Sequence, residues 1–148
     1  MTVMNVIIAG GRNVLDYSHC VEAVKQAPFQ ITRVVSGTAA GADRLGERYA
    51  QENNLPLIKK PADWDRYGKS AGYRRNEEMA KISHGLIALW DGKSRGTNHL
   101  IDIATRLGLK VFVYRVDQVS KKSLEDLQVL KSVFRYANDH KVVSFSVK

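Results

Sequence analysis

The sequence predicts an α/β fold, a Rossmann-like three-layer sandwich in which a mostly parallel sheet lies between two layers of helices. Short apolar runs alternate with segments of helical period, in the order βαβαβαβαβ. Strands that alternate with helices form βαβ units, which place helices on both faces of a parallel sheet. Of the 148 residues, 44% are hydrophobic and 26% are charged, which is ordinary for one globular domain.

The predicted strands are short apolar runs bounded by turn residues. They are Met4 to Ala9, Arg33 to Ser36, Leu55 to Lys59, Gly85 to Trp90 and Leu109 to Tyr114. The first two runs are followed at once by glycine, which is typical of a turn directly behind a buried strand. Segments of helical period lie between the strands at about Ser18 to Ala27, Ala42 to Asn53, Ala71 to Ile82 and Thr97 to Leu107.

The pattern changes after Asp117. Lys121 to Ala137 carries apolar residues at near-helical spacing, and Lys141 to Val147 has the pattern of a short strand. We predict a Rossmann-like domain over residues 1–118 and a C-terminal helix and short strand, residues 119–148, that extend the same domain. The apolar stripe is expected to pack on the sheet, although part of it is suited to a homodimer or higher homo-oligomer.

Composition excludes several classes of protein. No apolar run approaches the roughly 20 residues that span a bilayer, and the N-terminus lacks the segments of a secretion signal. We therefore expect a cytoplasmic protein with no membrane contact. Cys20 is the single cysteine, which excludes an intrachain disulfide, and its place on a predicted helix makes it a packing residue. The four histidines show no paired spacing for a metal, so no metal is expected. No cofactor is expected either.

The formal net charge of +8 raises the question of nucleic-acid binding. Residues 1–105 carry 14 Lys and Arg against 11 Asp and Glu, whereas residues 106–148 carry 9 against 4. The excess thus lies in a stretch that is expected to form a solvated amphipathic helix and tail. Generic surface charge is favoured over a dedicated nucleic-acid face, which stays open as the alternative.

Three glycine-containing loops follow predicted strands, at residues 10–12, 36–43 and 91–98. In a parallel sheet these loops share the carboxyl edge, where open α/β sheets bind ligands. Glycine permits close approach of the backbone, and the N–H groups at a helix start favour anions. Arg12 and Arg95 each lie in such a loop and can hold a phosphate with two hydrogen bonds. The alternative for any single loop is a tight turn, with Thr38 and Ser94 as helix N-caps.

The segment from Pro61 to Asn76 is long for this type of fold and rich in aromatic and basic residues. Trp64, Tyr67 or Tyr73 is suited to stack on a base, while Arg74, Arg75 and Asn76 are placed to reach phosphate or ribose. The alternative is a structural lid that Trp64 anchors. No phosphate-binding P-loop and no complete G-x-G-x-x-G motif is present, which argues against an ordinary NTPase or dehydrogenase. His99 lies within reach of the third loop but forms no recognisable catalytic triad.

Together these residues resemble the YspA-like branch of the SLOG superfamily, a Rossmann-like group that includes DprA and the LOG phosphoribohydrolases. The resemblance spans roughly residues 5 to 116 and does not cover the tail. The matching pieces, in chain order, are Gly10-Gly11-Arg12, Ser36-Gly37 with Gly41-Ala42-Asp43, Pro61 to Trp64, Tyr67-Gly68, Ala71-Gly72, Arg75-Asn76 with Met79, and Ser94 to Thr97.

The resemblance implies a pocket for a nucleotide or nucleotide-derived molecule, in proteins that act as sensors, binders or N-glycosidic hydrolases. The LOG hydrolases have a catalytic glutamate three residues after the threonine of their glycine turn, where this chain has Leu100. Asp43 and Asp91 are the remaining acid/base candidates, with ribose contact or helix capping as alternative roles. The predicted ligand-binding residues are Gly10, Gly11, Arg12, Ser36, Gly37, Gly41, Asp43, Trp64, Arg75, Asn76, Asp91, Ser94, Arg95, Gly96 and Thr97.

We therefore expect a module that senses or sequesters a nucleotide-derived phosphate ligand, for example an ADP-ribose-like or cyclic-nucleotide-like compound, without rapid turnover. The first alternative is an enzyme that cleaves an N-glycosidic or phosphate-linked bond in such a ligand. The second alternative is a DprA-like protein that binds single-stranded DNA.

Overall fold

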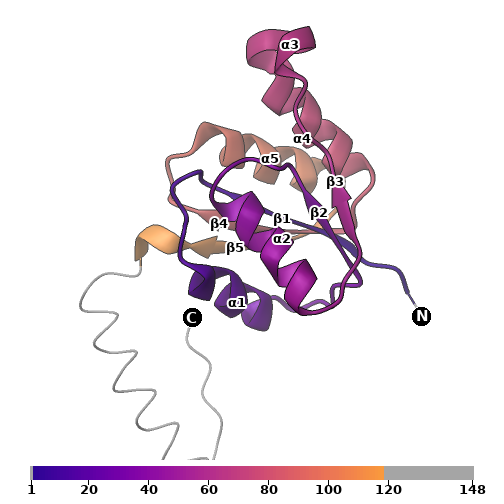
Figure 1. The fold of residues 1–148 in the computed structure, drawn as a ribbon, viewed down its shortest axis with the longest axis vertical. Coiled ribbons are helices and arrows are strands. Elements are labelled where there is room, and N and C mark those ends of the chain that lie inside the picture. Colours follow the sequence, from indigo (N-terminus) through magenta and orange to yellow (C-terminus); the bar gives the residue numbers. More distant parts are fainter. Residues whose placement is uncertain (1, 119–148) are drawn as a thin grey trace, which may run out of the picture. The chain divides into compact units, whose positions relative to one another are not determined.

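The structure, a computed structural model, describes residues 2–118. Five parallel strands form one sheet in the order β3-β2-β1-β4-β5 (Figure 1). The strands are β1 (Asn5–Gly10), β2 (Arg33–Ser36), β3 (Leu57–Lys59), β4 (Gly85–Trp90) and β5 (Lys110–Arg115). The helices are α1 (Tyr17–Gln26), α2 (Ala42–Glu52), α3 (Trp64–Tyr67), α4 (Ala71–Lys81) and α5 (Arg95–Arg106), with 3-10 turns η1 (Gly68–Ser70) and η2 (Val116–Gln118). The predicted α/β fold is confirmed, and the sheet is entirely parallel.

The central strand β1 is buried on both faces, which explains its unbroken apolar sequence. Val6 and Ile8 point into one cluster with residues of α1 and α2, and Ile7 points into a second cluster with residues of α4 and α5. Successive side chains of a strand alternate between faces, so one short run contributes to both helix layers. Cys20 is fully buried in the first cluster, and burial raises the pKa of its thiol to about 12. The expectation that Cys20 is a packing residue is confirmed.

Two local predictions need correction. The segment from Pro61 to Asn76 is not one long loop, because α3 and η1 lie within it. Asp63 caps α3 by accepting a hydrogen bond from the Arg66 backbone N–H at 3.1 Å. In Figure 1, α3 and the start of α4 project away from the sheet. Strand β3 begins at Leu57 rather than Leu55, and Pro56, which has no N–H, comes immediately before it.

The alternative role of Thr38, as the N-cap of α2, is wrong. The N-cap is Gly41, with a φ of 79° and no side-chain capping bond. A Cβ at Gly41 would lie 2.4 Å from the carbonyl oxygens of Gly11 and Arg12, so only glycine fits there. Thr38 instead adopts a positive φ of 64° and donates its backbone N–H to the Ser36 hydroxyl.

The compact unit that carries the sheet comprises Met1–Val116. The helix and strand predicted within residues 119–148 lie outside the described residues, and their assignment to the same domain stays a prediction. Among residues 2–118, none of the helices combines the length and apolar character that crossing a bilayer requires.

Candidate functional site

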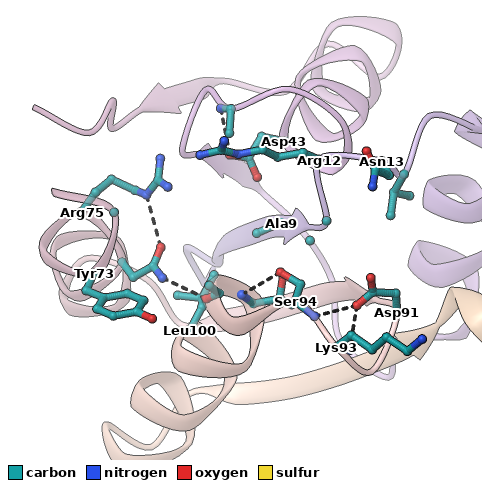
Figure 2. Close-up of a pocket in the computed structure, with 18 of the residues that line it drawn as sticks. Ala9, Arg12, Asn13, Asp43, Tyr73, Arg75, Asp91, Lys93, Ser94 and Leu100 are labelled. Carbon is teal, nitrogen blue, oxygen red and sulfur yellow. Dashed lines mark hydrogen bonds between the residues drawn. The ribbon is translucent and has the colours of Figure 1, made fainter. Parts of the chain in front are cut away.

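A cleft of about 650 Å³ lies at the carboxyl ends of the strands (Figure 2). The loops that follow β1, β2 and β4 meet helices α4 and α5 there, because parallel strands end at one edge of the sheet. Most of the predicted ligand residues line the cleft: Gly10, Gly11, Arg12, Asp43, Trp64, Arg75, Asn76, Asp91, Ser94, Gly96 and Thr97. The remaining lining residues are Ala9, Asn13, Val14, Ala39, Lys69, Gly72, Tyr73, Met79, Lys93, Leu100 and Val116.

The glycine turn after β1 holds the sheet and α2 together. A Cβ at Gly10 would lie 2.1 Å from the Leu89 carbonyl oxygen and 2.9 Å from the Ala42 Cβ. The Gly11 carbonyl accepts a hydrogen bond from the Ala42 backbone N–H at 3.1 Å. This hydrogen bond uses the Ala42 N–H at the start of α2, so that N–H is not available to an anion. These glycines bring backbone close to backbone as well as forming a wall of the cleft.

Three predicted ligand residues, at the end of β2 and in the loop that follows it, do not line the cleft. Ser36 is buried, and its hydroxyl donates to the Glu47 carboxylate at 2.7 Å. Gly41 gives the chain its entry into α2, and the Gly37 carbonyl accepts a hydrogen bond from the Arg75 guanidinium. Ser36, Gly37 and Gly41 therefore stabilise the conformation of the loop. Contact between these residues and a ligand stays a prediction.

Asp43 brings a buried carboxyl to the cleft. The residue is 5% exposed, and its Oδ2 accepts a hydrogen bond from the Ala39 backbone N–H at 3.0 Å. Burial raises the pKa of Asp43 to about 6, against the opposing effects of the Ala39 N–H and the Arg75 charge. Near neutral pH this group can accept a hydrogen bond from a hydroxyl or, when protonated, donate one.

Arg75 presents a guanidinium that is held in place from two sides. Its Nη1 donates to the Gly37 carbonyl, and its Nε donates to the Asn76 Oδ1 at 3.2 Å. Within residues 2–118, Nη2 takes part in no hydrogen bond, so its two protons are available to a ligand in the cleft. Burial lowers the pKa of Arg75, although an arginine stays charged at physiological pH. Arg12 also lines the cleft, and its positive charge contributes to the lowered pKa of Arg75.

The start of α5 forms the facing wall. Ser94 is the N-cap, as predicted, and its hydroxyl accepts from the Thr97 backbone N–H at 3.4 Å. Asp91 Oδ1 accepts the backbone N–H groups of Lys93 and Ser94 at 2.8 Å each, which explains this aspartate as a turn-forming residue. At Gly96 a Cβ would meet no heavy atom within 4 Å, so the first turn of α5 is open to the cleft.

Arg95 differs from its neighbours in the same turn. It is exposed and is not among the residues that line the cleft. Its predicted contact with a phosphate stays a prediction, and the cleft residue with the better-placed guanidinium is Arg75.

Aromatic rings lie near the end of the cleft that α3 and α4 form. Trp64 is 50% exposed and Tyr73 is 45% exposed. The Tyr73 ring stacks on His99 with centroids 4.3 Å apart and planes inclined by 26°. Trp64 lies over Gly72, with its ring carbon Cη2 3.4 Å from the position of a Cβ there. Exposed rings at a cleft are suited to stack on a base.

Sequence reasoning missed several lining residues, for different reasons. Lys93 lies within the predicted loop 91–98, and Asn13 directly follows the first glycine turn, so position alone could have found both. Met79 and Leu100 are core residues, exposed by 1% and 2%, that also line the cleft, and only the family resemblance had drawn attention to them. Among the described residues, no group of three or more His, Cys, Asp or Glu side chains is placed to hold a metal ion.

The comparisons with known proteins agree with this architecture. The model of the family described as "YspA, cpYpsA-related SLOG family" matches residues 4–67. The "Gene 61 protein" of Mycobacterium phage D29 is 33% identical over 117 residues, which cover 72% of this chain and 92% of that protein.

A solved structure is similar in fold. The X-ray structure of DNA processing protein A (DprA) from Streptococcus pneumoniae matches with a TM-score of 0.60 and 20% sequence identity. The match covers 86% of this chain and 56% of the DprA chain, so this chain spans little more than half of DprA. At this identity the likeness shows the fold alone. Family membership follows instead from the phage relative and the family model: the chain belongs to the YspA and cpYpsA-related SLOG family.

Proposed function

We propose that the cleft binds a nucleotide or nucleotide-derived phosphate ligand, and that the protein senses or sequesters this ligand. The observation that carries the proposal is Arg75, whose guanidinium is held by Gly37 and Asn76 with Nη2 left to the cleft. A desolvated, pre-oriented guanidinium binds phosphate oxygens better than a mobile surface arginine does.

The chemistry of the cleft matches the three parts of a nucleotide. The phosphate is suited to Arg75 and to the open first turn of α5 at Gly96. The Asp43 carboxyl is suited to the hydroxyl groups of a ribose, and the Tyr73 ring to a base. Basic groups outnumber acidic ones along the lining, with Arg12, Lys69, Arg75 and Lys93 against Asp43 and Asp91. This balance favours an anion.

The experiment that tests the proposal is native mass spectrometry of freshly purified protein, followed by a thermal-shift screen. The panel contains nucleoside monophosphates, ADP-ribose, NAD and cyclic dinucleotides, with the corresponding nucleosides as controls. A ligand that binds only the folded state raises its apparent stability by mass action. A panel in which no nucleotide raises the unfolding temperature above that of its nucleoside would contradict the proposal.

Arg75→Gln is expected to weaken a phosphate ligand by about ten- to a hundredfold, since one charge-assisted hydrogen-bonding group is lost. The matched control is Arg74→Gln, because Arg74 is the exposed neighbour on the same helix and does not line the cleft. The Arg74 Nε donates to the Ser70 hydroxyl at 3.1 Å, away from the proposed site. Calorimetric titration compares the two variants, and an equal loss of affinity in both would remove Arg75 from the site.

A second candidate function is hydrolysis of an N-glycosidic or phosphate-linked bond in such a ligand. Asp43 supports it, because a cleft carboxyl with a pKa of about 6 is suited to general acid/base catalysis near neutral pH. Binding is favoured because Leu100 stands where the LOG hydrolases have glutamate, and it is buried. We expect no multiple turnover when the panel is incubated with the protein and free base and phosphate are measured by chromatography. Turnover that Asp43→Asn abolishes would make the protein an enzyme.

A further inference from the structure

We propose that His99, which does not line the cleft, positions the ligand-binding groups of α4. In this proposal His99 fixes Asn76, Asn76 fixes the guanidinium of Arg75, and the His99 ring supports Tyr73. The inference rests on the proposed function and adds a residue that acts through Arg75.

The Asn76 side-chain amide is buried and hydrogen-bonded through both its nitrogen and its oxygen. The residue is 5% exposed. Its Nδ2 is 3.1 Å from the Gly96 carbonyl oxygen and 3.2 Å from the His99 Nδ1, while its Oδ1 accepts from the Arg75 Nε. Both amide protons and one oxygen lone pair are therefore engaged. A buried amide with these partners has one stable orientation.

The partners of Asn76 fix the direction of each of its hydrogen bonds. An inverted Asn76 amide would place its NH₂ against the Arg75 N–H and its oxygen against the Gly96 carbonyl oxygen, which are two repulsive pairs. The Asn76 Nδ2 must then donate to His99, so His99 Nδ1 must carry a lone pair. We therefore assign His99 as the neutral tautomer that carries its proton on Nε2.

The hydrogen bond between Asn76 and His99 is connected to the cleft through Arg75 and Gly96. Arg75 lines the cleft from α4, whereas Gly96 lines it from the first turn of α5. Asn76 contacts both, and the His99 acceptor keeps the Asn76 amide from rotating about its last torsion. Loss of that acceptor leaves a buried N–H unsatisfied, and rotation to satisfy it withdraws the oxygen from Arg75. The geometry of the phosphate-binding groups thus depends on His99.

The His99 ring also contributes to the other end of the ligand. It stacks on Tyr73, which is 45% exposed and lines the cleft. The acceptor and the stacking ring can be removed separately. His99→Phe keeps an aromatic ring beneath Tyr73 but has no acceptor, whereas His99→Gln keeps an acceptor oxygen but has no ring.

The test is a double-mutant cycle with AMP as the probe, measured by calorimetry. His99→Phe is expected to weaken AMP about three- to tenfold in the wild-type background, the effect of one lost hydrogen bond. In the Arg75→Gln background the same substitution is expected to change AMP affinity by less than about twofold, because the residue it acts through is gone. His99→Gln is expected to keep most of the AMP affinity that His99→Phe loses.

The matched control is His84→Phe. His84 Nδ1 also accepts a hydrogen bond, from the Asn5 backbone N–H at 3.0 Å, but it precedes β4 at the edge of the sheet opposite the cleft. His84→Phe also removes a hydrogen-bond acceptor nitrogen, but this acceptor has no connection to Arg75. The AMP affinity of this variant is expected to stay at the wild-type value.

A second readout does not depend on any variant folding. Nitrogen chemical shifts of the imidazole in the ligand-free wild-type protein report which ring nitrogen carries the proton, and we expect Nε2–H for His99. An Nδ1–H tautomer would overturn the inference, as would an equal effect of His99→Phe in both backgrounds. AMP binding that depends on Arg75 but not on His99 would overturn this inference alone. Absence of any nucleotide binding by the wild-type protein would overturn the proposed function as well.

Discussion

Gly10→Ala is expected to lower the free energy of unfolding by about 3 kcal/mol or more, the upper range for overpacking a rigid site. The new methyl group would lie 2.1 Å from the Leu89 carbonyl oxygen, which is backbone of β4. It would also lie 2.9 Å from the Ala42 Cβ on α2. Neither neighbour is the flexible end of a long side chain. The end of β1 therefore has to move away from β4 or from α2. Urea denaturation of both proteins measures the loss.

Gly96→Ala is the matched control. A Cβ at Gly96 meets no heavy atom within 4 Å, and the residue lies in the first turn of α5. Alanine favours helix over glycine by up to about 1 kcal/mol, so stability is expected to be unchanged or slightly raised. Similar unfolding free energies for Gly10→Ala and the wild-type protein would contradict the close approach of β1 to β4.

The fold was predictable because its signals are local. Strand β1 is apolar at four successive positions since it is buried on both faces, and that run is visible in the sequence. The error at β3 is also local in origin. Leu55 continues the apolar run, but its backbone N–H donates to the Ala50 carbonyl at 2.8 Å and so belongs to the end of α2. An apolar pattern does not reveal where a backbone N–H finds its partner.

The candidate site was predictable only in part. The glycine loops mark the carboxyl edge of the sheet, and this follows from topology alone. The sequence predicted Arg12, Arg75 and Arg95 alike, and it does not show that Arg95 stays outside the cleft. Nor does it show that Arg75 on α4 is held by Gly37, 38 residues earlier in the chain. The partners of Asn76 lie 20 and 23 residues away, on α5. Such contacts depend on how helices α4 and α5 pack against each other. The pattern of residues along one segment does not reveal this packing.

Asp43 links the site to the stability of the fold, and Asp43→Asn is expected to stabilise the protein at neutral pH. The pKa of Asp43 rises from its ordinary value of 3.8 to about 6 in the folded state. Between these values the folded state binds more protons than the unfolded state, so the contribution of Asp43 to stability is present at low pH and is lost as pH rises to about 6. The loss corresponds to about 3 kcal/mol at 1.36 kcal/mol per unit of pKa.

Asparagine stays neutral and can still accept the Ala39 N–H, so Asp43→Asn avoids this loss. Its free energy of unfolding is expected to exceed that of the wild-type protein by about 2 to 3 kcal/mol at pH 7.5, and the difference is expected to fall to about 0.5 kcal/mol at pH 4. Urea denaturation of both proteins at each pH measures this difference in unfolding free energy. The effects of all other titrating groups cancel in the comparison, because both proteins contain them. Asp65→Asn, at an exposed position of α3, is the control and is expected to change stability by less than about 0.5 kcal/mol.

A gain that is equal at both pH values would show that packing, and not the charge of Asp43, causes it. A gain confined to neutral pH means that the fold tolerates a destabilising carboxylate in the cleft, which is the mark of a group retained for binding or chemistry.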